Sequence, residues 1–327
     1  MTRKTISLIA AGVGALFMTA GAWAQSAGSY PSRPVRWIVP FAPGASNDIT
    51  ARLLAQKMTE SLGQQFVVDN RPGAGGSIGA GLVATATPDG YTLLHANPGP
   101  SVNNVILRKR SSYKMEDFAP VVFIGYVPLI IVATPSLPAN NIKEFVTYAK
   151  ANPGKVTWAS SGLGSSLHIG LALFQAASGV DVVHVPYKGT APALLDVVPG
   201  RVQVMHTTTV SAATHIKANR VKVLGVAGPE RQAVQPNVAT LEEQGVKNAE
   251  ATVWFGVQVP AKTPQPIIAK LNAELNKTLK LPDVKQKLDQ LGLIVKGGSP
   301  QDFAAFMKTE ADRLQMLIKT KRVEMIE

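Results

Sequence analysis

The sequence predicts an α/β fold made of two domains. Short apolar runs rich in β-branched residues alternate with segments of helical periodicity, a pattern typical of parallel α/β sheets. The chain has 327 residues, more than a single hydrophobic core usually holds. Two further apolar segments, 121–134 and 252–259, stand between the α/β blocks. We interpret them as crossover strands that join two domains, which makes the first domain discontinuous.

The first α/β block opens with an apolar strand at 35–39 and a helix that starts at Ser46–Asp48. The apolar residues of this helix fall on one face, and Gly63 ends it. The later short runs have the composition of buried strands. They are expected at 65–68, 91–94, 156–159, 182–185, 202–205 and 221–224, with helices between them, for example at 166–178 and 192–198.

The C-terminal region is predicted to be mainly helical. One helix face is marked by apolar residues over 268–279, and a second, shorter helix runs over 283–291. Ser299 is expected to cap the last helix, with Pro300 at its first position and Asp302 at its third.

The N-terminal 24 residues have the pattern of a secretory signal peptide. Arg3 and Lys4 precede an apolar stretch at 6–19, and Ala22-Trp23-Ala24 forms a cleavage site, so the mature chain is expected to begin at Gln25. The alternative is an uncleaved anchor, but the apolar stretch is short for a membrane span. We therefore expect a periplasmic protein.

Together these features predict three parts. Residues 1–24 form the signal peptide, residues 25–127 and 253–327 form the discontinuous first domain, and residues 128–252 form the second domain.

Composition excludes several classes of site. The chain has no cysteine, so disulfides, thiolate metal sites, cysteine nucleophiles and acylated lipoproteins are excluded. The net charge is +12 and its densest cluster is Arg108-Lys109-Arg110, but the charges are otherwise scattered. Nucleic acid is therefore not an expected partner, although a basic surface attracts small anions. The five histidines lack metal-ligand spacing, so no metal or cofactor is expected.

The segment 39–52 is the most informative part of the chain. An apolar strand runs through a Pro/Gly turn into small residues and a helix start. The first N–H groups of a helix have no intrahelical partner and lie at the positive end of its dipole, so this corner favours anions. The segment holds no obvious nucleophile or metal ligand, which indicates a binding protein rather than an enzyme.

Several segments share one family pattern over nearly the whole mature chain. They are 30–35, 39–52, 68–79, 88–93, 117–121, 160–168, 186–193, 254–256 and 263–264. In their order and spacing, the chain resembles the periplasmic solute-binding proteins of tripartite tricarboxylate transporters, the Bug or TctC-like family. The resemblance implies a type II-like periplasmic binding protein, with two α/β domains that close on a small carboxylate in the cleft between them.

The resemblance also implies a set of ligand contacts, made by backbone N–H groups, small hydroxyl side chains and ordered waters. In the first domain they are Ala45, Ser46, Asn47 and Asp48; in the second they are Ser161, Ser165, Ser166, His168, Gly189, Thr190 and Ala191. We expect Asp48 to act mainly as a helix cap, because its carboxylate would repel an anion.

The chain departs from the family pattern at two places. Ala45 stands where the family usually has glycine, and Met205-His206-Thr207 replaces a common aromatic-acidic pair. Both changes are expected near the cleft, so both are candidates for setting ligand preference.

Two motifs permit other interpretations. The loop 73–79 resembles a dinucleotide loop but fails the strict G-x-G-x-x-G spacing at Ile78, so a structural or partner-docking loop is favoured. The serines near His168 suggest a hydrolase, but none of them stands in a G-x-S-x-G pattern and no acidic residue is nearby in sequence.

These observations favour a monomeric binding protein that captures a small organic carboxylate, such as a dicarboxylate or an aromatic acid. It would deliver the ligand to membrane subunits of the TctA/TctB type. The alternative is a periplasmic carboxylate sensor that presents its closed form to a membrane receptor, and an enzyme ranks third.

Overall fold

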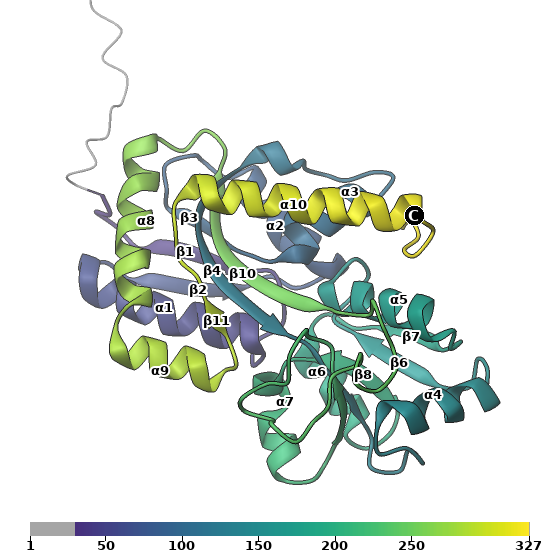
Figure 1. Ribbon diagram of the computed structural model, residues 1–327. Helices are drawn as coiled ribbons and strands as arrows, with labels where there is room; N and C mark the ends of the chain where they lie inside the picture. The colour runs from purple at the N-terminus through teal and green to yellow at the C-terminus, as the bar shows by residue number, and fades with distance from the viewer. Residues whose placement is uncertain (1–29, 327) are drawn as a thin grey trace, which may run out of the picture. The chain divides into compact units, whose positions relative to one another are not determined.

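The computed structural model describes residues 30–326 and places their strands in two sheets (Figure 1). The predicted signal peptide and Gln25 lie outside the described residues. One sheet has six strands in the order β11-β4-β10-β3-β1-β2, and the other has five in the order β7-β6-β8-β5-β9.

The six-stranded sheet is built from both ends of the described chain. Its strands are β1 (Val35–Val39), β2 (Phe66–Asn70), β3 (Thr92–Ala96), β4 (Phe118–Pro128), β10 (Thr252–Pro260) and β11 (Ile294–Val295). Its helices are α1 (Ser46–Leu62), α2 (Ser77–Ala84), α3 (Asn104–Leu107), α8 (Gln265–Leu279), α9 (Pro282–Gln290) and α10 (Pro300–Lys319).

The five-stranded sheet comes from the middle of the chain. Its strands are β5 (Ile130–Ala133), β6 (Thr157–Ser160), β7 (Val183–Pro186), β8 (Val204–Thr207) and β9 (Lys222–Val226). Its helices are α4 (Ile142–Ala151), α5 (Ser166–Ser178), α6 (Thr190–Val197) and α7 (Thr209–Lys217).

The sheets are mixed, which corrects the expectation of parallel sheets. Strands β1, β2 and β3 are parallel, as are β6, β7 and β8, and these are the strands joined through helices. Strand β10 pairs antiparallel with both β3 and β4, and β5 pairs antiparallel with β8 and β9. The antiparallel strands adjoin the crossings between the sheets.

The chain crosses between the sheets at two adjacent points. The apolar segment predicted as one strand over 121–134 is two strands, β4 and β5, that belong to different sheets with Leu129 between them. The return crossing lies just before β10, at Ala251. The Leu129 N–H donates to the Ala251 carbonyl at 3.0 Å, so the two crossings are hydrogen-bonded to each other.

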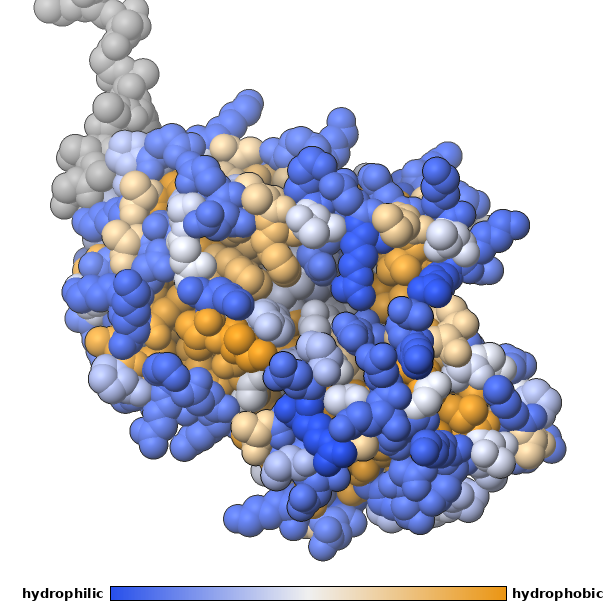
Figure 2. Space-filling view, in the orientation of Figure 1, coloured by the Kyte–Doolittle hydropathy of each residue, from blue (hydrophilic) through white to orange (hydrophobic). Residues whose placement is uncertain are grey.

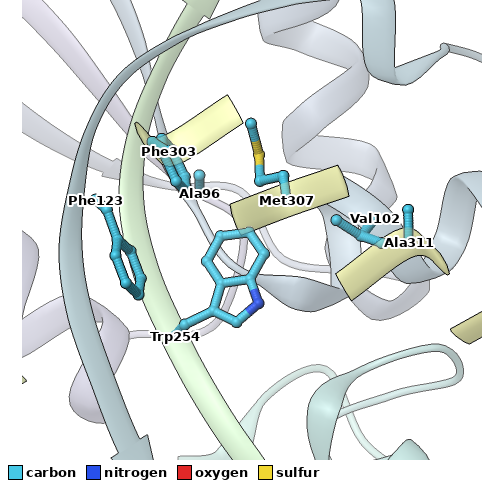
Figure 3. Close-up of a cluster of buried hydrophobic side chains, with 7 residues drawn as sticks. All are labelled: Ala96, Val102, Phe123, Trp254, Phe303, Met307 and Ala311. Carbon is cyan, nitrogen blue, oxygen red and sulfur yellow. The ribbon is translucent and has the colours of Figure 1, made fainter. Parts of the chain in front are cut away.

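Helices cover the six-stranded sheet in two groups (Figure 1). Helix α1 packs with α8 and α9, whereas α10 packs with α3 and β4. Beneath α10 lies an apolar cluster in which Trp254 packs edge-on to Phe303 (Figure 3). The other members of this cluster are Ala96, Val102, Phe123, Met307 and Ala311.

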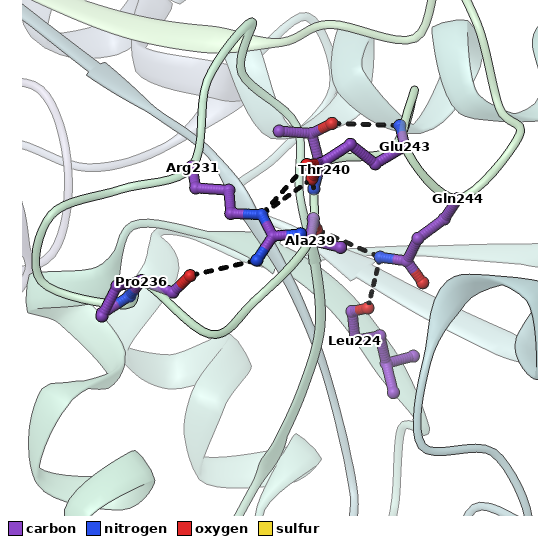
Figure 4. Close-up of polar contacts among 7 residues, drawn as sticks. All are labelled: Leu224, Arg231, Pro236, Ala239, Thr240, Glu243 and Gln244. Atoms are coloured by element: carbon purple, nitrogen blue, oxygen red, sulfur yellow. Dashed lines mark hydrogen bonds and ion pairs between the residues drawn. The ribbon is translucent and has the colours of Figure 1, made fainter.

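Between β9 and β10 the chain forms a long connection without helices, held by side chains (Figure 4). Arg231 Nε donates to the Glu243 carboxylate at 3.0 Å, and Gln244 Nε2 donates to the carbonyls of Leu224 and Ala239 at 3.0 and 3.1 Å. These contacts tie the connection to β9.

On the face seen in Figure 2, hydrophilic side chains predominate and an apolar area lies beside β11, whose Ile294 is 43% exposed. None of the helices described over 30–326 is long and apolar enough to cross a membrane.

Most predicted elements exist, with boundaries shifted by one or two residues. The largest strand shift is at β8, expected at 202–205 and found at Val204–Thr207. Apolar residues indicate which part of a strand is buried, but backbone pairing with the neighbouring strand determines where the strand ends. His206 belongs to β8 because it pairs with Ile131 of β5.

Candidate functional site

The candidate residues follow the carboxyl ends of parallel strands in both sheets. Strand β1 leads to Ala45–Asp48 at the start of α1, β6 leads to Ser161–His168 at the start of α5, and β7 leads to Gly189–Ala191 at the start of α6. The carboxyl ends of parallel strands lie at one edge of a sheet, where α/β proteins bind ligands. The candidate residues therefore lie at sheet edges of the kind where ligand binding is expected, and their role as ligand contacts stays a prediction.

The start of α1 contacts the other sheet. Ala45 is the residue before the helix and has an extended backbone, with φ −105° and ψ 176°. Ser46 is the first helical residue, and its N–H donates to Ser211 Oγ at 3.1 Å. A hydroxyl oxygen of the second sheet thus accepts one of the N–H groups that the helix itself leaves unpaired.

Asp48 is turned back into its own loop. Its carboxylate accepts hydrogen bonds from the Gly44 N–H and from Arg52 and Asn70 side chains, at 3.0–3.1 Å. Burial by itself would raise its pKa, but these hydrogen bonds more than offset that effect and lower the pKa. Asp48 is therefore ionised, and its charge is neutralised within its own loop. The N-cap residue of α1 is Ala45, which corrects the expectation that Asp48 caps this helix.

At the start of α5, Ser165 is the cap residue. Ser165 Oγ accepts from the His168 N–H at 3.3 Å. Ser166 lines a small pocket together with Glu310 and Arg313 of α10. Ser166 therefore lies beside α10.

His168 stacks on a second histidine that the sequence analysis did not assign. The rings of His168 and His184 lie 4.5 Å apart, and Ser160 Oγ lies 2.6 Å from His184 Nε2. The Gly164 N–H donates to His168 Nδ1 at 3.2 Å. Burial lowers both pKa values to about 4, and for His168 the neighbouring His184 adds to the shift. Both rings are thus neutral at pH 7, and neither supplies a positive charge.

The start of α6 lies against the loop before α1. The Ala42 N–H donates to the Lys188 carbonyl at 3.3 Å, and a Cβ added to Gly189 would lie 3.0 Å from the Ala42 nitrogen. Thr190 is buried and Ala191 is partly exposed. Backbone contact at Gly189 thus brings Thr190 close to the α1 loop.

The start of α7 also contacts the α1 start, and none of its residues was predicted as a site residue. Thr208 caps this helix by accepting from the Ser211 N–H at 3.2 Å, and its hydroxyl donates to Ser211 Oγ at 2.8 Å. The available signal was the run Thr207-Thr208-Thr209 directly after an apolar strand, since threonine is a common cap. No sequence pattern could pair Ser211 with Ser46, which lies 165 residues earlier.

Of the unusual segment Met205-His206-Thr207, the middle residue does not face the ligand edge. The His206 ring is fully buried and lies 5.1 Å from the Trp158 ring. Burial lowers its pKa to about 3. His206 is therefore part of the core, and its effect on ligand preference stays a prediction.

The glycine loop 73–79 packs against the loop 162–164 of the other sheet. A Cβ added to Gly75 would lie only 1.9 Å from the Leu163 carbonyl oxygen. Asn104 Nδ2 donates to the Gly75 carbonyl at 2.8 Å, and Asn103 Nδ2 donates to the Gly164 carbonyl at 3.0 Å. We name these two loops, with Asn103 and Asn104, the glycine contact.

Four buried side chains at these helix starts hold a polar atom without a partner. Ser46 and Ser161 are 4% exposed, and Asn47 and Thr190 are 7% exposed. Within residues 30–326, none of the three hydroxyl groups has a hydrogen bond, and neither has the Asn47 amide nitrogen. These four atoms are not among the fully buried polar atoms without partners, so each keeps some contact with solvent. All four can donate hydrogen bonds.

Nothing in the described part of the chain groups three or more metal-binding carboxylates or imidazoles. The glycine loop presents its carbonyls to Asn104 and Arg108, and these acceptors do not suit a phosphate.

Comparison with known proteins places the chain in one family. Residues 50–323 match the family described as "Tripartite tricarboxylate transporter family receptor". An R. palustris protein solved with adipate is 34% identical, with a TM-score of 0.86 over 89% of this chain and 98% of that chain. The periplasmic binding protein BugD is 36% identical, with a TM-score of 0.86 over 90% and 99%.

A third structure, MatC from Rhodopseudomonas palustris with bound malate, is 33% identical, with a TM-score of 0.85 over 88% of this chain and 100% of that one. The two-sheet α/β fold is thus that of periplasmic binding proteins, and the chain belongs to the tripartite tricarboxylate transporter receptor family.

Proposed function

We propose that this protein binds a small organic carboxylate between the carboxyl ends of its two sheets, without converting it, and delivers it to a membrane transporter. The observation that carries the proposal is the set of four unpartnered donors at buried residues: Ser46, Asn47, Ser161 and Thr190. A carboxylate only accepts hydrogen bonds, so it matches such a set.

The electrostatics support a neutral site of this kind. Asp48 is paired within its own loop, and the His168 and His184 rings are uncharged at pH 7. The starts of α1, α5 and α6 add the positive ends of three helix dipoles. Charge-assisted hydrogen bonds from neutral donors would then supply the affinity.

The comparisons support the ligand class. The related structures contain adipate and malate, which are both dicarboxylates. We take a dicarboxylate as the first class to test and an aromatic acid as the second.

In this proposal the two sheets form two domains, 25–127 with 253–327 and 128–252, that close on the ligand about the crossings at Leu129 and Ala251. Closure follows from a ligand that touches both domains. Export by a cleaved signal peptide at 1–24, docking on TctA/TctB-like subunits and a monomeric state complete the proposal.

The test compares acids with their amides. Adipate and malate should raise the melting temperature of the protein, whereas adipamide and malamide should not. The NH2 group of an amide is itself a hydrogen-bond donor, so it cannot accept from the donors of the site. Binding adds about 2.7 kcal/mol of stability at a ligand concentration roughly 100 times Kd. Equal stabilisation by acid and amide would contradict the proposal.

Two variants locate the site. Ser46→Ala should weaken acid binding by ~1–3 kcal/mol, the range for a hydrogen bond to a charged partner. The exposed Thr147→Ala on α4, whose hydroxyl donates only to the Lys143 carbonyl, is the matched control and should leave binding unchanged. Unchanged affinity in Ser46→Ala would mean that the ligand lies elsewhere.

A further inference from the structure

Asn97 connects the end of β3 to the start of α1. It directly follows β3 and is 2% exposed. Its amide group makes two hydrogen bonds. The Gly99 N–H donates to Asn97 Oδ1 at 3.2 Å, and Asn97 Nδ2 donates to Asn47 Oδ1 at 3.0 Å.

These two hydrogen bonds determine which way the amide groups of Asn97 and Asn47 point. A backbone N–H can only donate, so the oxygen of Asn97 has to face Gly99, and its NH2 group has to face Asn47. Asn47 then has to turn its own oxygen toward Asn97. The Asn47 amide nitrogen is left on the other side, and there it has no partner among the residues that the structure describes.

We propose that Asn97 is a positioning residue that sets the hydrogen-bond polarity of the ligand site by holding Asn47 as a donor. The inference rests on the proposed function, because it takes Asn47 as a ligand contact. It goes further in assigning the site a basis for selecting an ionised carboxylate over the isosteric carboxamide.

The candidate contacts contain no fixed cation. None of them is Lys or Arg, and His168 is neutral at pH 7. In a site of neutral donors, a single amide turned the wrong way presents a carbonyl oxygen to the carboxylate. The amide oxygen then repels the carboxylate, whereas the amide NH2 group would attract it, and burial of the site strengthens both interactions.

The variant Asn97→Asp keeps the shape, reverses the polarity and also adds a negative charge; amide exchange in the wild-type protein, which involves no substitution, separates the effect of polarity from that of charge. One carboxylate oxygen still accepts from the Gly99 N–H, and the other faces Asn47 and can only accept. Asn47 should therefore turn its NH2 group inward and its oxygen toward the ligand. We expect adipate or malate affinity to fall by about tenfold or more. Adipamide or malamide affinity should stay unchanged or rise.

The matched control is Asn276→Asp on α8. Asn276 has the same type of contact, since its Oδ1 accepts from the Gly298 N–H at 2.9 Å and its Nδ2 donates to backbone carbonyls. The substitution adds the same charge outside the candidate site and should leave the acid-to-amide affinity ratio unchanged. An unchanged ratio in Asn97→Asp, in a variant that still binds the acid, would overturn the inference.

A ligand-free measurement on the wild-type protein tests the same geometry if Asn97→Asp does not fold. Side-chain amide hydrogen exchange by NMR should be slow for Asn97, which is enclosed and bonded, and fast for Asn47. Equally slow exchange at Asn47 would overturn the inference. Failure of the wild type to bind either acid would instead count against the proposed function, because the exchange result does not depend on a ligand.

Discussion

Around Gly75 the two sheets meet through backbone atoms, whereas around Ser46 they meet through hydroxyl and amide groups. At the glycine contact, an added methyl group would overlap the Leu163 carbonyl oxygen. At the α1 start, the Ser46 N–H donates to Ser211, and neighbouring donors have no partner among residues 30–326. From this difference we infer two roles: the glycine contact limits how closely the sheets approach, and the α1 start is the region proposed to select the ligand.

The largest expected effect comes from filling the glycine contact. Gly75→Ala places a Cβ 1.9 Å from the Leu163 carbonyl oxygen, at a residue whose φ is +64°. We expect a loss of ~2–3 kcal/mol in the free energy of unfolding, from overpacking added to the backbone cost. Urea denaturation measures the loss, and titration with adipate or malate measures the effect on binding.

Gly63→Ala is the control for the backbone cost alone. Gly63 has a similar φ of +70° at the end of α1, with no atom within 4 Å of an added Cβ. It should lose only about 1 kcal/mol. If both variants lose the same amount, the glycine contact is not close-packed and the comparison between the two regions fails.

An effect of similar size is expected from pH, through the histidine next to the glycine contact. The pKa of His168 is lowered from 6.5 to about 4 by burial and by His184. The unfolded chain therefore binds the proton first as pH falls, so stability is lost between about pH 6.5 and pH 4. The slope is up to about 1.4 kcal/mol per pH unit for this group.

His168→Asn tests this slope, because Asn keeps an acceptor for the Gly164 N–H but does not titrate. Stability measured by urea denaturation from pH 7 to pH 4.5 should fall less steeply than in the wild type. His215→Asn, at a partly exposed site on α7, should change the slope less. A slope identical to that of the wild type in His168→Asn would show that His168 does not stay neutral in the folded protein.

The smallest expected effect is at the α1 start. Ala45 has an extended backbone that any residue adopts, and it is 1% exposed. Ala45→Gly should therefore cost no more than about 1 kcal/mol, mainly through added freedom of the unfolded chain. We expect it to widen the range of ligands, since it removes a methyl group where the family usually has glycine.

A panel of mono- and dicarboxylates of increasing bulk, titrated against both forms, would measure that range. Identical relative affinities would remove Ala45 from the list of selectivity residues, while the role of the helix start in binding anions could stand.

Local rules made much of this structure predictable. Helix α1 runs over Ser46–Leu62 and ends at Gly63 with a left-handed backbone, as the apolar spacing and the glycine indicated. Ser299 and Asp302 form the expected reciprocal cap of α10. In each case the deciding residues lie within a few positions of one another, so a short stretch of sequence holds the necessary information.

Contacts between distant segments were not predictable. The loop after β6 contains several serines, and only the structure shows that Ser165 caps α5 while Ser166 lines a pocket beside α10. Ser211 and Asn97 were missed because each acts on the α1 start from another strand end. The glycine loop was noticed, but its partner at Leu163 depends on how the two sheets meet.

The position of β10 has a consequence for how the chain is made. β10 lies between β3 and β4 in the sheet, yet residues 129–251 separate it from β4 along the chain. The ribosome therefore completes the whole five-stranded sheet before it adds the strand that fills the middle of the other. Until then β4 has no partner strand in this sheet and β3 keeps an unpaired edge. This order of synthesis postpones completion of the six-stranded sheet until β10 has been translated.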